Sequence, residues 1–173
     1  MSTPVKVGIV GLGRWAKVLT RASKQSNKVQ IVAGYSRSEE KRSAFEKEMG
    51  VPAVPDMKTM LSNPELKGVI LTVPNEQHLP MAEMVAKAGK HVYTEKPISQ
   101  TLEDGLKIEA LQKQYGVTVT VGHSARLMAG IRMIKEKHKF HIHLRCTPIY
   151  PTYLTLLLSS HDRRELTRVA LKK

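Results

Sequence analysis

The stretch that decides the fold lies near the N-terminus and reads Val5-Lys-Val-Gly-Ile-Val-Gly-Leu-Gly-Arg-Trp-Ala16. Its first six residues have the short apolar pattern of a buried strand, and the next six have the form G-x-G-x-x-A. In such a turn the first glycine permits the tight change of direction, the second leaves room for a pyrophosphate, and the small last residue lets a helix pack closely. The helix N-terminus then attracts the phosphates. The spacing therefore predicts a dinucleotide-binding turn, with a purely structural turn as the alternative; the expected cofactor contacts are Gly11, Leu12, Gly13, Arg14 and Trp15.

The end of the next strand decides which dinucleotide is expected. Val29–Tyr35 has the pattern of this strand, and Ser36 and Arg37 follow it. NAD-binding units place a carboxylate here, on the ribose 2′-hydroxyl. A hydroxyl and a guanidinium instead suit a 2′-phosphate, so we expect NADP to be preferred, with NAD possible. Arg14 and Arg42 add positive charge nearby. The alternative is that Ser36 caps a helix and Arg37 is simply solvated.

Strand and helix patterns alternate along the first 126 residues. This alternation predicts an α/β fold with a doubly wound parallel sheet, in which ligands bind beyond the carboxyl ends of the strands. Further strands are expected at Val51–Val54, Gly68–Thr72, His91–Thr94 and Val117–Val121. Helices are expected at Ser38–Met49, Asp56–Ser62, His78–Ala88 and Thr101–Tyr115, with Asp56 and Thr101 as caps and Gly50, Gly89 and Gly116 as terminators.

Composition narrows the class of protein. The chain of 173 residues has room for one domain with a real core. Of its net charge of +13, residues 1–136 carry +7, scattered through helical patterns, whereas the much shorter stretch 137–173 carries +6. This distribution argues against nucleic-acid binding. No secretory leader and no membrane-spanning run is visible, and the single Cys146 suits a reducing compartment. We therefore expect a cytoplasmic protein without nucleic-acid or membrane partners.

Three further motifs follow the glycine turn in order. They are Thr72-Val-Pro74-Asn75 with His78, Ala88-Gly-Lys-His-Val-Tyr-Thr-Glu-Lys-Pro97, and Val121-Gly-His-Ser-Ala-Arg126. Together the four motifs resemble the cofactor domain of the glucose–fructose oxidoreductase / inositol dehydrogenase family (Gfo/Idh/MocA), over about residues 4–136. The resemblance implies a Rossmann-type domain that uses NAD or NADP to oxidise or reduce a sugar, an inositol or a related polyol.

The resemblance also assigns roles to residues. It implies that Lys96 is catalytic and helps to move the proton of the reacting hydroxyl, and an ammonium in a partly dry cleft can indeed stabilise a developing alkoxide. The alternative is an ordinary surface pair with Glu95. His91 is expected to be structural, and a helix-start role is the alternative for His78. The remaining implied cofactor contacts are Thr72, Pro74, Asn75 and His78 toward the nicotinamide end, Glu95 at its ribose, Pro97 at the turn, and His123 and Arg126 beside nicotinamide and substrate.

The resemblance stops after a connecting helix, which we place at 127–136. The family's second domain, with its Asp-x-x-x-His element, is not recognisable in residues 137–173, which contain no glycine. We therefore expect a Rossmann domain at 1–126 followed by an atypical basic tail, out of frame or strongly diverged. His138, His141, His143 and Cys146 have a spacing that suits zinc, but accidental clustering is the favoured interpretation, and no metal site is expected.

The function that follows is an NAD(P)-dependent oxidoreductase truncated to its cofactor domain. The alternative is a non-catalytic dinucleotide-binding protein or an inactive remnant. The expected partners are a dinucleotide, a polyol substrate only where a substrate domain is supplied, and a second copy of the chain. Self-association is expected because loss of a packed domain exposes apolar surface.

Overall fold

The computed structural model describes residues 3–131 and 133. The chain divides into two units, the first ending at Gly122 and the second beginning at His123. The expected tail at 137–173 lies outside the described residues, so its predicted character stays a prediction.

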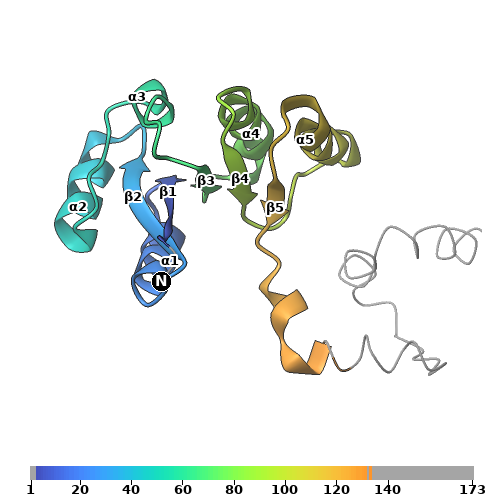
Figure 1. Cartoon of the computed structure of the whole chain (residues 1–173), viewed down its shortest axis with the longest axis horizontal. Helices are drawn as coiled ribbons and strands as arrows, with labels where there is room; N and C mark the ends of the chain where they lie inside the picture. The colour runs from blue at the N-terminus through green and yellow to red at the C-terminus, as the bar shows by residue number, and fades with distance from the viewer. Residues whose placement is uncertain (1–2, 132, 134–173) are drawn as a thin grey trace, which may run out of the picture. The chain divides into compact units, whose positions relative to one another are not determined.

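The first unit alternates strands and helices (Figure 1). Along the chain it contains β1 (Val5–Val10), α1 (Arg14–Lys24), β2 (Val29–Tyr35), α2 (Glu39–Met49), α3 (Met57–Leu61), β3 (Gly68–Leu71), the 3-10 helix η1 (Asn75–Gln77), α4 (His78–Lys87), β4 (His91–Thr94), α5 (Leu102–Tyr115) and β5 (Val119–Val121). The second unit begins with the 3-10 helix η2 (Ser124–Leu127).

The strands form one five-stranded parallel sheet in the order β2-β1-β3-β4-β5. The predicted α/β fold with a doubly wound parallel sheet is confirmed. The chain passes from β1 outward to β2 and then returns to place β3 on the other side of β1. The crevice at this change of direction is where doubly wound sheets bind ligands.

Two expected strands differ from the structure. Val51–Val54 is not a strand but a single bridge between Ala53 and Gly34, because the prolines on either side lack the N–H groups that would extend the ladder. The last strand begins at Val119 rather than Val117. There the N–H of Thr118 donates to Nδ1 of His91 over 3.0 Å, so a side chain takes the place of a ladder bond.

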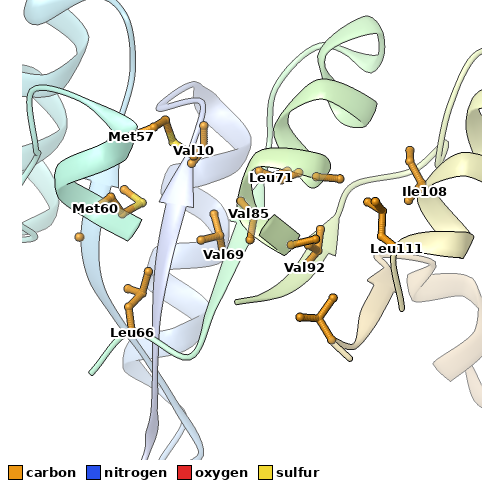
Figure 2. Close-up of a cluster of buried hydrophobic side chains, with 14 residues drawn as sticks. Val10, Met57, Met60, Leu66, Val69, Leu71, Val85, Val92, Ile108 and Leu111 are labelled. Carbon is orange, nitrogen blue, oxygen red and sulfur yellow. The ribbon is translucent and has the colours of Figure 1, made fainter. Parts of the chain in front are cut away.

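Apolar side chains alternate between the two faces of the sheet, as the period of a strand requires. On one face Val7 and Ile9 pack with Ala16 of α1 and Phe45 of α2. On the other face Val10 joins the larger cluster under α3, α4 and α5, which Figure 2 shows from Met57 across Leu71 to Leu111. The two clusters hold the sheet between two layers of helices, and this sets the strand ends in place.

The predicted helix caps are confirmed. Asp56 accepts from the N–H of Thr59 at the start of α3, and Thr101 accepts from the N–H of Asp104 at the start of α5. The hydrogen bonds from Thr59 hold the pKa of Asp56 below its ordinary value. Gly50 and Gly116 end α2 and α5 with positive φ angles of 62° and 65°. These local signals explain why the helix boundaries follow from the sequence.

Candidate functional site

The predicted site residues follow the strands at a common edge of the sheet. The register places the last residues of all five strands in one row: Tyr35, Val10, Leu71, Thr94 and Val121. The next residues along the chain therefore lie along the same edge. This brings together the glycine turn, the loop after β2, the loop after β3 and the Glu95–Pro97 segment, which are separated by up to 86 residues in sequence.

Position 11 requires glycine because of the fold, independently of any ligand. Its φ angle is +89°, and a Cβ built on it would lie 2.7 Å from the carbonyl oxygen of Thr72. The hydroxyl of Thr72 reaches back to the same turn, 2.7 Å from the carbonyl oxygen of Gly11 and 3.0 Å from that of Val10. The predicted role of Thr72 at the cofactor is untested, but its hydroxyl proton is committed to holding this turn against β3.

Gly13 has no such requirement from the protein. Its backbone is extended, with φ −85° and ψ −168°, and a Cβ there would meet no atom within 4 Å. The absence of a side chain thus leaves open space in front of the first turn of α1. A pyrophosphate needs this kind of close backbone approach, so the residues present fit a dinucleotide.

The N-terminus of α1 also differs from those of α2, α3 and α5. Ser38, Asp56 and Thr101 cap α2, α3 and α5 with side-chain oxygens. The start of α1 has no side-chain cap and no acidic residue in its first turn. Its N–H groups and its dipole are therefore available to an anion. Leu12 is buried in the core, so it offers a ligand only its backbone, whereas Arg14 and Trp15 are exposed.

The side chain of Arg42 holds the backbone of the loop after β2, whereas the sequence suggested Arg42 only as additional positive charge near the cofactor. Nη1 of Arg42 donates to the carbonyl oxygens of Ser36 over 2.7 Å and of Arg37 over 3.2 Å. Ser38, not Ser36, caps α2 through the N–H of Lys41, so the cap role for Ser36 is excluded. Among the described residues, neither the Ser36 hydroxyl nor the Arg37 guanidinium has a hydrogen-bond partner, and no carboxylate stands at the strand end.

Glu95 and Lys96 do not form the surface ion pair that was the alternative interpretation. Glu95 is 9% exposed, and its carboxylate accepts from the backbone N–H of Lys96 over 3.4 Å. The side chain of Lys96 is exposed, and within the described part of the chain its ammonium pairs with no carboxylate. The Lys96–Pro97 peptide is cis. The segment thus presents a free ammonium beside a buried carboxylate.

The negative charge of Glu95 acts on the hydroxyl group of Tyr93 on β4. Burial raises the pKa of the Tyr93 hydroxyl above its ordinary value, and the negative charge of Glu95 raises it further. A Cβ on Gly122 would clash with the hydroxyl oxygen of Tyr93, so Tyr93 and the end of β5 are in close contact. The side chain of Tyr93 is therefore packed against the sheet edge.

The loop after β3 contains the other predicted contacts. Pro74 is exposed and Asn75 is half-buried at the start of η1. His78 is fully buried, and both of its ring nitrogens face backbone carbonyl oxygens. Its side chain therefore lies beneath the site rather than on its surface, and it reaches the site through the loops that it contacts.

His123 and Arg126 belong to the second unit, where His123 precedes η2 and Arg126 lies in it. Their predicted place beside the nicotinamide stays a prediction. Among the described residues no helix has the length and apolar character that a membrane crossing needs, and no group of three histidine, cysteine or carboxylate side chains is placed to hold a metal ion. The histidines and Cys146 considered for zinc lie outside the described residues.

Comparison with known proteins gives a consistent result. The family model described as "Oxidoreductase family, NAD-binding Rossmann fold" (GFO_IDH_MocA) matches residues 5–123. A 1-carboxy-3-chloro-3,4-dihydroxycyclohexa-1,5-diene dehydrogenase from Comamonas testosteroni is 31% identical over 133 residues, which cover 76% of this chain and 34% of that protein. The chain thus spans about a third of the length of this relative.

Solved structures show the same partial correspondence. A putative NADPH-dependent oxidoreductase from Desulfitobacterium hafniense is 40% identical with a TM-score of 0.75, over 79% of this chain and 40% of that one. The WlbA dehydrogenase from Bordetella pertussis, solved with NADH and UDP-GlcNAcA, is 27% identical with a TM-score of 0.74, over 79% and 42%. The similar structures thus include one protein named for NADPH and one solved with NADH.

The two glycines of the turn provide a matched pair of substitutions. Gly13→Val should weaken dinucleotide binding by about tenfold or more, since its side chain occupies the open space before α1, while the melting temperature changes little. Gly11→Ala should lower the melting temperature, because its Cβ meets the Thr72 carbonyl. Calorimetric titration and thermal unfolding of both variants measure the contrast. Loss of stability in Gly13→Val with unchanged affinity would contradict the assignment.

Proposed function

The chain belongs to the Gfo/Idh/MocA oxidoreductase family, and we propose that its first unit binds NADP in preference to NAD. The observation that carries this proposal is the loop after β2, where the Ser36 hydroxyl and the Arg37 guanidinium have no hydrogen-bond partner among the described residues. A guanidinium binds phosphate oxygens in a bidentate way, and a hydroxyl adds a further donor. The first carboxylates after this loop, Glu39 and Glu40, belong to the first turn of α2.

The strand order sets the direction in which the dinucleotide lies. The 2′-phosphate at the end of β2 and the pyrophosphate at the start of α1 fix the adenosine half over β2 and β1. The nicotinamide half then extends over β3 and β4, the next strands in the sheet. The residues that we place along this half are Thr72, Pro74, Asn75, Glu95 and Pro97.

For the reaction, we propose oxidation or reduction at an alcohol carbon of a sugar, an inositol or a related polyol. The bound nicotinamide supplies the hydride chemistry, whereas the protein supplies orientation and charge. The exposed ammonium of Lys96 donates a hydrogen bond to the reacting oxygen and stabilises the negative charge that develops there. The buried Glu95 accepts from the backbone N–H of Lys96, which limits the positions of this residue.

We further propose that the chain self-associates and works in the cytoplasm. Leu127, Met128 and Met133 in the second unit are 79%, 61% and 55% exposed. In the first unit an apolar depression of about 180 Å³ lies on the sheet, where Val7, Ile70 and Tyr93 line it. Apolar surface of this kind favours association. The single cysteine suits a reducing compartment.

The cofactor preference depends on Arg37. Arg37→Asp should lower NADP affinity by about tenfold or more and leave NAD affinity equal or higher, because it removes a phosphate partner and adds a repelling charge. Lys67→Asp makes the same change of charge at the opposite end of the sheet, before β3, and should leave the preference intact. Calorimetric titration with both dinucleotides measures it. Tighter binding of NAD than of NADP to the unmodified chain would refute the assignment.

The 173-residue chain by itself should bind the cofactor but turn over polyols slowly or not at all. It spans about a third of the Comamonas dehydrogenase, and positioning of the substrate supplies about 7–11 kcal/mol of barrier lowering in well-oriented reactions. Reduction of NADP by a panel of sugars and inositols, monitored by absorbance with Lys96→Met as the control, is the measurement. Robust turnover that disappears in Lys96→Met would show that this chain already holds a complete site.

Self-association is measured by sedimentation velocity from about 1 to 100 micromolar, the range in which exposed apolar surface promotes association. A dimer or a larger species is expected despite the repulsion from a net charge of +13. Leu127→Lys with Met128→Lys should shift the distribution toward monomer. A monomer of 19.4 kDa at every concentration would contradict the prediction.

A further inference from the structure

The imidazole ring of His78 lies between backbone carbonyl oxygens of two different loops. His78 begins α4 and is fully buried. Its Nδ1 lies 3.0 Å from the carbonyl oxygen of Pro97 and 3.3 Å from that of Ile98. Its Nε2 lies 3.1 Å from the carbonyl oxygen of Val73. One ring therefore contacts two chain segments that are more than twenty residues apart in sequence.

The chemistry of these contacts is restrictive. A carbonyl oxygen only accepts hydrogen bonds, so a ring nitrogen that bonds to one of these loops donates its proton, and the tautomer decides which nitrogen does so. Because the ring is buried, loss of this bond would carry the full cost of desolvation. The imidazole thus bonds to one loop and packs against the carbonyl group of the other.

These segments are the loops that follow β3 and β4. The backbone pairing of the two strands ends where the N–H of Glu95 donates to the carbonyl oxygen of Leu71 over 3.1 Å. Beyond that bond, the described residues form no backbone hydrogen bond between the loop at Val73 and the segment Lys96–Ile98. Beyond the end of the ladder, the imidazole of His78 provides the polar contact between the two loops.

We propose that His78 is a positioning residue, which joins the loops after β3 and β4 and so sets where Lys96 lies against the nicotinamide half of the cofactor. This inference rests on the proposed binding of NADP. Because the adenosine half lies over β2 and β1, loss of His78 should weaken only the contacts with the nicotinamide half of the ligand. A histidine that served the core alone would have no such selectivity.

The selectivity can be measured with two ligands. Adenosine 2′,5′-bisphosphate carries the adenine and the 2′-phosphate but no nicotinamide, whereas NADP carries both halves. His78→Gln carries its N–H donors on a single nitrogen, so it cannot present them from the two positions that the ring nitrogens occupy. We expect calorimetric titration to give about tenfold weaker binding of NADP, as the loss of one buried hydrogen bond implies, and an affinity for adenosine 2′,5′-bisphosphate within about twofold.

The matched control is His91→Gln. His91 lies at the other end of β4, is exposed, and accepts from the N–H of Thr118. The same substitution there should leave both affinities unchanged. An equal loss of both ligands in His78→Gln would mean a general structural role, and unchanged NADP binding would mean that the loops keep their positions without the ring; either result overturns the proposal.

A second measurement is independent of the cofactor and of the variant's folding. In the unmodified chain labelled with ¹⁵N-histidine, nuclear magnetic resonance should show a ring N–H proton of His78 that exchanges slowly with solvent, because the ring is buried and bonds to a loop carbonyl oxygen. Rapid exchange of this proton would overturn the proposal, whether or not His78→Gln folds. If the unmodified chain binds neither ligand, the proposed function fails, and this measurement still decides whether the ring bonds to a loop carbonyl oxygen.

Discussion

The close approach of Gly11 to the carbonyl group of Thr72 is the constraint on which the rest of the site depends. A Cβ at Gly11 would lie 2.7 Å from that oxygen, so only glycine lets the turn after β1 pass directly over the end of β3. Because the turn is tight, α1 starts at Arg14 with its N-terminus facing the sheet edge. The open space at Gly13 and the uncapped first turn of α1 follow from this geometry.

The loops at this edge share a second property: side chains hold their backbone carbonyl groups. Thr72 binds the carbonyl oxygens of the glycine turn, Arg42 binds those of the loop after β2, and His78 contacts those of the loops after β3 and β4. Strand pairing cannot extend into these loops, so donors from neighbouring elements satisfy their acceptors instead. The groups left free at the edge are then suited to a ligand, and among the described residues they include the Ser36 hydroxyl and the side chains of Arg37 and Lys96.

Membership of the oxidoreductase family agrees with this separation between side chains that hold the loops and side chains that are free for a ligand. The relatives include proteins named for NADPH and structures solved with NADH. The features that belong to the sheet, such as the glycine turn and the strand order, serve either dinucleotide. The features that discriminate between them lie in the loop after β2, where a change of one or two side chains exchanges a carboxylate for a phosphate partner.

Features that depend on neighbouring residues along the chain could be predicted from the amino-acid sequence. They are the glycine turn, the caps at Asp56 and Thr101, the terminators Gly50 and Gly116, and the alternation of strands and helices, and the structure confirms them. Features that depend on contacts between distant segments became visible only in the folded protein. Val51–Val54 makes a single bridge, Arg42 holds a loop, and His78 is buried between carbonyl groups rather than exposed. In a sequence these side chains look the same whether they face a ligand or a neighbouring loop, because their partners are brought to them only by the packing of the sheet.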